Sequence, residues 1–168
     1  MTTRFSFLSI LLASVLLAGP VQAQNRPSYE VRVTDANGAP SIALGRHLVQ
    51  VTGCNDCHTS GYGASNGHVS ESQWLTGDSL GWSGPWGTTY AANLRLYFAR
   101  ISAAQWKEFA RHGEPRPPMP WFNLREMSDK ELMSIYLYIR SAGPAGSPAP
   151  AALPPGQRPS SPVIQFPQ

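Results

Sequence analysis

Two cysteines and a histidine stand within five residues, and this cluster constrains the fold more than any other feature of the chain. The segment reads Cys54-Asn55-Asp56-Cys57-His58, and it holds both cysteines of the 168-residue sequence. A zinc site needs about four ligands, usually two cysteine pairs or one pair with two spaced histidines, and the sequence offers neither. A thioredoxin-type redox pair belongs to a βαβ context, whereas this motif stands between a predicted helix and a glycine-rich segment.

Covalent haem attachment explains the motif best. Two thiols three residues apart can add to the two vinyl groups on one edge of a porphyrin, and the histidine that follows can then bind the iron. A structural disulfide is the alternative, but it explains neither the histidine nor the long loop that comes after it. We therefore predict one covalent haem c, attached to Cys54 and Cys57 and ligated by His58.

The second axial ligand decides between electron transfer and chemistry at an open iron. Six side chains could supply it, namely Met119, Met127, Met133, His47, His68 and His112. Met119 lies in the segment RPPMPW between two predicted helices, where the prolines reduce the entropy lost when the loop is ordered. Met127 precedes a helix cap and can pack against Leu132. We predict Met119 as the ligand; a core-filling role is the alternative for this side chain.

The first 23 residues have the pattern of an export signal. A basic start is followed by an apolar run over residues 5–18, a Gly-Pro break and a small-residue cleavage site that ends at Ala23. The apolar run is shorter than the roughly 20 residues that a spanning helix needs. We expect cleavage after Ala23, a periplasmic location and no membrane span in the mature form.

Composition divides the rest of the chain into three parts. Residues 24–40 are predicted to form an extended lead-in, residues 41–142 the folded domain, and residues 143–168 a Pro/Ala/Gly-rich tail. The tail has too many prolines for a helix or a central strand, so we expect it to be extended, either wrapped on the surface or loose.

The charge pattern excludes one class of partner. The net charge is +3, and the basic residues form neither a run nor a basic helix, so nucleic-acid binding is not expected. One local excess of basic side chains is explained either as a solvated face or as a docking patch for an acidic partner. Its members are Arg95, Arg100, Lys107, Arg111 and Arg116.

Three helices are predicted from apolar periodicity and caps, over residues 41–51, 103–112 and 129–141. Ser102 with Gln105 and Ser128 with Glu131 are capping-box pairs at the starts of the second and third helices. Residues 59–90 lack a helical period, and we interpret them as a long ordered loop whose aromatic side chains pack against the haem.

These segments together resemble the class I c-type cytochromes, which are monohaem domains with His/Met-ligated haem, and are most similar to the bacterial periplasmic members. The matching pieces are a helix with Gly45 before the CxxCH motif, then GPWGTTYAANL, PPMPW and MSDKELMSIYLYIRS, within residues 41–141. The resemblance implies an all-α fold whose first and last helices cross near the haem, with Gly45 and Tyr138 at the crossing. It also implies Cys54 and Cys57 as thioether sites, with His58 and Met119 as the axial ligands.

The resemblance further implies an electron carrier and not an enzyme, with a dehydrogenase, an oxidase or another cytochrome as redox partner. One alternative is a dedicated cytochrome subunit of a dehydrogenase or oxidase complex. Another is a haem enzyme or gas-binding protein in which Met119 is displaceable. A proline carbonyl is expected to orient His58, and Pro85 is the candidate. The candidate haem-pocket residues are Pro85, Trp86, Tyr90, Asn93 and Trp121.

Overall fold

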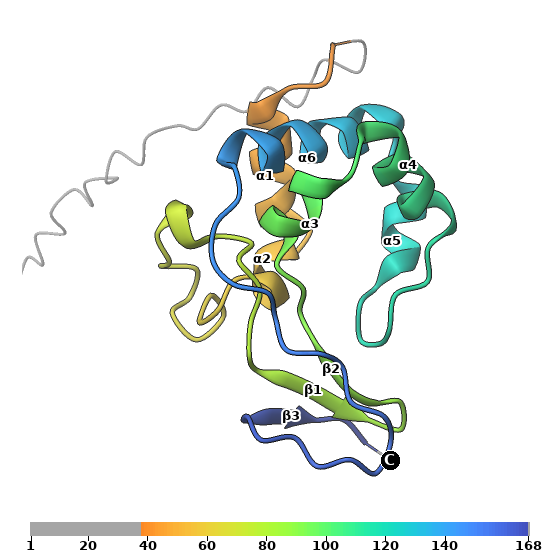
Figure 1. The fold of residues 1–168 in the computed structure, drawn as a ribbon. Coiled ribbons are helices and arrows are strands. Elements are labelled where there is room, and N and C mark those ends of the chain that lie inside the picture. Colours follow the sequence, from red (N-terminus) through yellow and green to blue (C-terminus); the bar gives the residue numbers. More distant parts are fainter. Residues whose placement is uncertain (1–37, 168) are drawn as a thin grey trace, which may run out of the picture. The chain divides into compact units, whose positions relative to one another are not determined.

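The computed structural model describes residues 38–167, so the predicted export signal and most of the lead-in lie outside the described residues. The helices of this part are α1 (Ile42–Val51), α2 (Cys54–His58), α3 (Leu94–Arg100), α4 (Ala103–His112), α5 (Trp121–Glu126) and α6 (Asp129–Ala142) (Figure 1). A 3-10 turn at Glu71–Gln73 precedes the strands β1 (Gly81–Gly84), β2 (Gly87–Tyr90) and β3 (Val163–Gln165). Within residues 38–167, no helix has the length and apolar character needed to cross a membrane.

Helices α1 and α6 cross in close contact, as predicted, because Gly45 has no side chain. A Cβ atom added to Gly45 would overlap the carbonyl oxygen of Ser134 and lie 2.8 Å from the Cβ atom of Tyr138. The hydroxyl of Ser134 also accepts a hydrogen bond of 3.1 Å from the backbone N–H of Ser41, the N-cap of α1. The start of the first helix is therefore fixed to the middle of the last one.

Both predicted capping boxes are confirmed. At the start of α4, the Ser102 hydroxyl accepts from the N–H of Gln105, and the Gln105 side chain accepts from the N–H of Ser102. Ser128 and Glu131 form the same reciprocal pair at the start of α6. Each box satisfies two backbone donors that the first turn of a helix leaves unpaired, which explains why these helices begin where the sequence predicts.

The apolar core contains side chains from α1, α3, α4 and α6. Val49 and Leu132 have no exposed surface, and the rings of Phe98 and Trp106 lie 4.8 Å apart between centroids. The indole N–H of Trp106 donates to the backbone carbonyl of Leu132 at 2.8 Å, so its polar group is satisfied inside the core. The other buried members of this cluster are Leu48, Trp74, Leu75, Ala110, Leu124, Ile135, Tyr138 and Ile139.

The prediction of an all-α fold is wrong, because part of the segment predicted as a loop forms a β-hairpin. β1 pairs antiparallel with β2, from Gly81 opposite Tyr90 to Gly84 opposite Gly87, around a two-residue turn. The Thr-Thr-Tyr sequence of β2 consists of β-branched and aromatic residues, which favour strands. Four residues a strand are too few for a clear alternating pattern, which is why the sequence alone suggests a loop.

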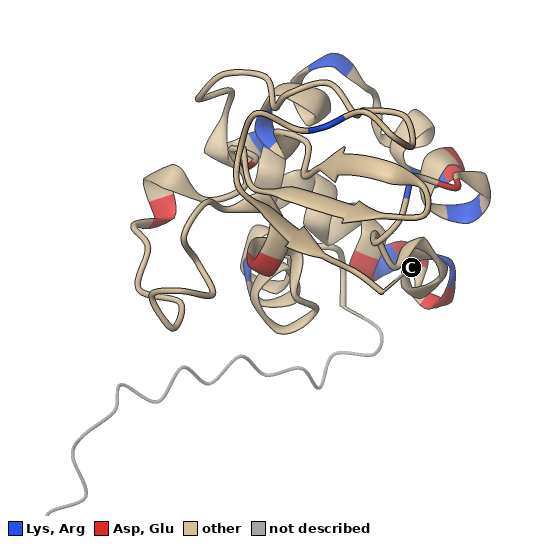
Figure 2. Ribbon diagram, turned by 90° about the horizontal axis from the view of Figure 1, so that it is seen from below, with Lys and Arg blue, Asp and Glu red and all other residues tan. Residues whose placement is uncertain are grey.

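The C-terminal tail completes the sheet. β3 pairs parallel with β1, with Gly81 opposite Val163, and the strand order is β2-β1-β3. β3 occupies a short stretch without proline, so its backbone N–H groups are available for the ladder. None of the three strands contains a charged residue; the charged side chains of the described part lie on helices and loops (Figure 2).

Arg95 of α3 is buried and holds the end of α6. Its guanidinium donates to the backbone carbonyls of Ala142 and Gly143, and also to that of Ser72 at 2.7 Å. The last carbonyls of a helix have no partner within the helix and form the negative end of its dipole. A buried cation therefore stabilises them both by hydrogen bonds and by its charge. Arg95 is therefore part of the core and not a surface charge.

A charged network fixes the 3-10 turn against α1 and α6. The Arg46 guanidinium of α1 donates to both carboxylate oxygens of Glu71 at 2.9 Å, and the Tyr138 hydroxyl of α6 donates to one of them at 2.9 Å. The hydrogen bonds from Arg46 hold the pKa of Glu71 below its ordinary value. Burial and the neighbouring Glu71 carboxylate raise the pKa of Tyr138, which keeps its hydroxyl a donor. This network anchors the middle of the long segment after α2.

We expect Glu71 to contribute to a loss of stability at acidic pH. Because the pKa of Glu71 is lowered by folding, its stabilisation is complete above the ordinary glutamate pKa and disappears as the pH falls through the lowered value. The ion pair is partly exposed, so its contribution should be under about 1 kcal/mol. Urea unfolding between about pH 6 and pH 3 should give a shallower pH dependence for Glu71→Gln than for the wild type.

Glu126→Gln is the matched control. Glu126 is exposed on α5, and the described part of the chain gives it no ion pair, so this variant should keep the wild-type pH dependence. Equal slopes for Glu71→Gln and Glu126→Gln would contradict the role assigned to Glu71.

Candidate functional site

Helix α2 presents the two cysteines on one face and is fixed through the other. Gly53, at its N-cap, has a φ of 76°, a left-handed conformation that allows the sharp turn out of α1. Cys54 and Cys57 are one helical turn apart and half-buried, and both thiols are free. On the opposite face, the hydroxyl of Thr59 donates to the buried Asn55 side chain at 2.7 Å and accepts from a backbone N–H of the following loop at 2.8 Å.

The electrostatics of the thiols argue against a redox pair. Burial raises the pKa of Cys54, and burial together with the carboxylate of Asp56 raises the pKa of Cys57. Reactive thiols in redox motifs have a lowered pKa, because a nearby positive charge or helix dipole stabilises the thiolate. These two thiols have the opposite environment.

The ring of His58 is oriented by the backbone carbonyl of Ala92. The distance from His58 Nδ1 to this oxygen is 2.7 Å. A carbonyl can only accept, so Nδ1 carries the hydrogen and the lone pair of Nε2 remains available for a metal. Burial lowers the pKa of His58, which favours the neutral imidazole that binds metals. The expectation that Pro85 supplies this carbonyl is wrong, because Pro85 lies in the exposed turn between β1 and β2.

Met119 lies in the loop between α4 and α5, residues 113–120. Its side chain is partly buried and packs against the same apolar cluster as Cys54. Met127, at the C-cap of α5, packs there as well, next to the α6 start where the staple with Leu132 is predicted. The structure thus places Cys54 and Met119 against one cluster, while the role of Met119 as ligand stays a prediction.

The candidate pocket residues have different surroundings. Asn93 caps α3 by accepting from the N–H of Leu96 at 2.9 Å. The hydroxyl of Tyr90 accepts from Ser161 at 3.2 Å. The ring of Trp121 stacks under the guanidinium of Arg125, at 4.1 Å from its centroid. Their haem contacts stay predictions.

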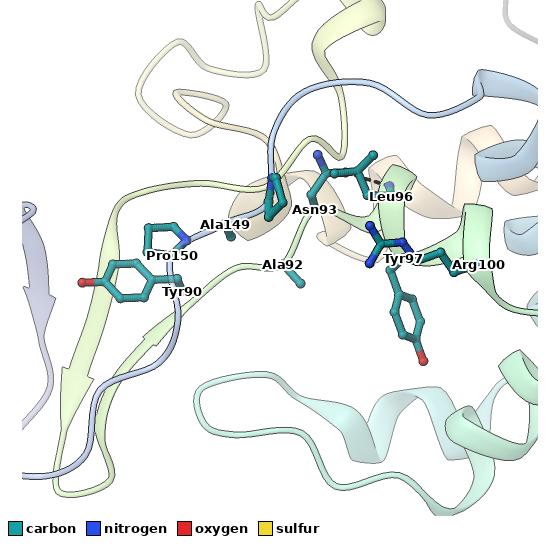
Figure 3. A pocket seen from close by; sticks show the side chains of 9 residues that line it. Tyr90, Ala92, Asn93, Leu96, Tyr97, Arg100, Ala149 and Pro150 are labelled. Atoms are coloured by element: carbon teal, nitrogen blue, oxygen red, sulfur yellow. Dashed lines mark hydrogen bonds between the residues drawn. The ribbon is translucent and has the colours of Figure 1, made fainter.

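A cavity of about 280 Å³ borders the residue that orients His58 (Figure 3). Tyr90 reaches it from the end of β2, Tyr97 and Arg100 from α3, and Pro150 from the tail. Of the candidate residues, Tyr90 and Asn93 line this cavity. The remaining lining residues are Ala92, Leu96, Pro148 and Ala149. The contribution of the tail could not be predicted from the sequence, because a proline-rich composition indicates an extended chain but not where that chain lies.

Two polar side-chain atoms of the hairpin are buried without a protein partner in the described part of the chain. They are the indole nitrogen of Trp86 and the hydroxyl of Thr89. Buried polar groups are nearly always hydrogen-bonded in folded proteins, so these atoms are suited to a polar group of a bound molecule. Thr89 is a residue that the sequence analysis did not single out.

The basic residues between 95 and 116 are largely engaged within the protein. Arg95 is buried, Lys107 and Arg111 pair with Asp129 at 3.0 and 2.9 Å, and Arg116 donates to backbone carbonyls. The Asp129 carboxylate offsets part of the charge of Lys107 and Arg111, and burial removes Arg95 from the surface. The structure therefore favours internal roles over a docking patch.

Comparison with known proteins gives a family match and two distant relatives. The model of the cytochrome c family matches residues 42–143. The fructose dehydrogenase cytochrome subunit of Gluconobacter japonicus is 27% identical over 122 residues, which are 66% of this chain and 23% of that protein. A subunit of the nicotinate dehydrogenase of Pseudomonas putida is 27% identical over 123 residues, 67% of this chain and 10% of that protein. The chain thus spans less than a quarter of either relative, and no solved structure matches it significantly.

Proposed function

Because the chain belongs to the cytochrome c family, we propose that it carries one covalent haem c and transfers single electrons between redox proteins. The observation that carries the proposal is the geometry of α2. The hydrogen bond from His58 to the Ala92 carbonyl leaves Nε2 free, on the same short helix as two free thiols. Haem c, when bound, supplies an iron centre that takes up and releases one electron.

The residues of the chain fit this cofactor. Cys54 and Cys57 would hold it covalently, and neutral His58 would bind the iron while the Ala92 carbonyl fixes its ring. The unpaired indole nitrogen of Trp86 and hydroxyl of Thr89 are suited to polar groups such as the carboxylates of a porphyrin. The apolar cluster beside Cys54 would exclude water from the macrocycle.

Met119 is proposed as the second axial ligand. Its thioether is a soft donor that suits haem iron, and its side chain is partly buried against the cluster that Cys54 also contacts. Prolines on both sides restrict the loop before any ligand binds, which lowers the entropy lost on ordering it. Two filled axial positions would favour electron transfer over substrate turnover.

The location and the partner are proposed from sequence and comparison together. The export pattern of residues 1–23 supports a periplasmic location. The names of both relatives refer to dehydrogenases, and one is a cytochrome subunit. A dehydrogenase is therefore the favoured partner, with an oxidase or another cytochrome as the other candidates. The same observation favours a second candidate function, a cytochrome subunit held within a dehydrogenase complex.

Met119→Ala should remove the weak long-wavelength band that a sulfur-to-ferric-iron bond gives. The reduction potential should fall by on the order of 0.1–0.3 V, part of the roughly 0.8 V range that axial ligands span. Carbon monoxide should bind rapidly to the ferrous variant and slowly to the ferrous wild type. Absorption spectroscopy, redox titration and flash photolysis measure these three effects.

Met127→Leu is the matched control, because it removes the other loop-end sulfur that packs against the cluster. It should keep the band and the potential, and cost under about 1.5 kcal/mol of stability as a volume-conserving change. Loss of the band in Met127→Leu, with the band kept in Met119→Ala, would show that Met127 and not Met119 is the ligand. Rapid carbon monoxide binding by the wild type, together with haem-dependent peroxide turnover, would replace the carrier function with a haem enzyme.

A further inference from the structure

The tail after α6 holds the β1–β2 hairpin by both edges. Leu153 pairs with Thr88 of β2, with backbone N–H to carbonyl distances of 2.8 and 3.0 Å. Further along, β3 pairs with the other edge of the hairpin, through β1. The Phe166 ring then packs against Trp82 and Trp86, with centroids 6.1 and 5.3 Å away. Residues 143–167 therefore form a clasp around the hairpin (Figure 1).

The beginning of this clasp is attached to Asn93, the N-cap of α3, which follows the residue that orients His58. The side-chain amide of Asn93 donates to the carbonyls of Ala145 and Ser147 at 2.8 and 3.1 Å. Asn93 directly follows Ala92, whose carbonyl orients His58. The clasp is thus fixed at its start, at Leu153 and at β3, and does not behave as a free extension of α6.

Arg116 joins the clasp to the loop that carries Met119. Its guanidinium donates to the carbonyl of Trp86, in the hairpin turn, at 2.6 Å and to the carbonyl of Leu153, in the clasp, at 3.1 Å. One side chain therefore connects three segments that are far apart in the sequence. Hydrogen bonds from a charged donor are stronger than neutral ones, which makes Arg116 the main polar connection among these segments.

The loop itself has few means of attachment. Residues 115, 117, 118 and 120 are prolines, which have no backbone N–H to donate. The backbone hydrogen bonds of Met119 stay within the loop region: its N–H donates to the carbonyl of Arg116, and its own carbonyl accepts from Trp121. Side chains must then supply the contacts with the rest of the fold. Glu114 pairs with Arg125 of α5 at 3.1 Å, and Arg116, three residues before Met119, reaches the hairpin and the clasp.

We propose that the clasp, acting through Arg116, holds the loop in place and that Arg116 is a positioning residue for the Met119 thioether. The proposal deepens the proposed function and rests on it, since Met119 must be the iron ligand for its position to matter. The hydrogen bonds of the Arg116 guanidinium are to backbone carbonyls of the hairpin turn and the clasp, so its effect on the sulfur is exerted through the loop. Its hydrogen bonds raise the population of the loop conformation in which the Met119 thioether is held in place.

The first test measures how easily an external ligand replaces the thioether. Imidazole is added to the ferric holoprotein while the sulfur-to-iron band is followed. Arg116→Gln should bind imidazole about tenfold more tightly than the wild type, because losing partly exposed hydrogen bonds from a charged donor raises the open population by about that factor. Arg116→Lys keeps a charged donor and should lie between the two. Arg158→Gln removes an exposed arginine of the clasp for which the described residues give no hydrogen bond, and should match the wild type.

The second test reads the clasp without relying on the iron. The backbone amide hydrogens of Met119 and Leu153 should exchange with solvent faster in Arg116→Gln than in Arg158→Gln. Phe166→Ala loosens the packing on Trp86 and leaves Arg116 unchanged. It should also increase the exchange rate of the Leu153 amide. Faster exchange of the Met119 amide in Phe166→Ala as well would show that the clasp and the loop open together.

The outcomes separate this proposal from the proposed function. A wild type without the sulfur-to-iron band would contradict the ligation by Met119, and the clasp would then be judged on exchange alone. With the band present, wild-type imidazole affinity in Arg116→Gln would overturn the positioning role. Wild-type exchange at Met119 and Leu153 in the same variant would overturn the clasp itself.

Discussion

Replacing Gly45 with valine should abolish the folded protein, with a loss of more than about 4 kcal/mol in the free energy of unfolding. The added Cβ would overlap the Ser134 carbonyl oxygen, which is backbone and cannot rotate away. Helices α1 and α6 would have to separate, and the packed core beneath them does not deform continuously. A domain of this size has only about 5–15 kcal/mol of stability in total, so little native structure should remain.

Ala43→Val is the control for this change. Ala43 is exposed on the same helix, so the valine there costs only its lower helix propensity, under about 1 kcal/mol. Urea unfolding and the yield of haem-loaded protein should both separate the two variants. Similar midpoints for Gly45→Val and Ala43→Val would mean that the crossing is not close in solution.

Replacing Arg95 with methionine should cost about 3 kcal/mol or more. Methionine can occupy the space of the arginine stem, but it leaves the carbonyls of Ser72, Ala142 and Gly143 without their shared donor. The three hydrogen bonds are only partly buried, but each comes from a charged donor and such bonds contribute about 1.5–3 kcal/mol; the end of α6 also loses a cation that complements its dipole. Thermal or urea unfolding measures the loss directly.

Arg100→Met provides the comparison on the same helix. Arg100 is exposed at the end of α3, so losing its charge should change stability by less than about 0.5 kcal/mol. Because both variants remove one positive charge, a difference between them reports burial and not net charge. Equal stabilities would show that the Arg95 hydrogen bonds contribute nothing.

Local signals account for the parts of the fold that the sequence predicts. Helices α4 and α6 begin at serines whose partners stand three residues further along, and such pairs are complete within one turn. The CxxCH motif is also local, because one short helix contains both thiols and the histidine. Gly45 is visible too, as a small residue on the apolar face of the helix that leads to the motif.

The features that sequence analysis missed depend on distant segments or on backbone atoms. The sheet requires β3 to pair with β1, which lies more than 70 residues earlier in the chain. Strands this short have no sequence pattern that indicates such a pairing. The partner of His58 is a carbonyl, which every residue possesses, so no residue type marks Ala92. In the sequence, Arg95 cannot be distinguished from an exposed arginine, because its three partners are backbone carbonyls of distant residues. The axial role of Met119 and the domain boundaries stay predictions.

The crossing of α1 and α6 also bears on the order in which the protein can fold. Ser41 and Ser134, which join the two helices, are 93 residues apart, so the contact closes a long loop and must await the last helix. A chain that emerges N-terminus first presents Cys54 and Cys57 well before α6 exists to bury the face of α1. The α1–α6 crossing is therefore among the last native contacts that the chain can form, although it fixes the helix that leads directly into the cysteine pair.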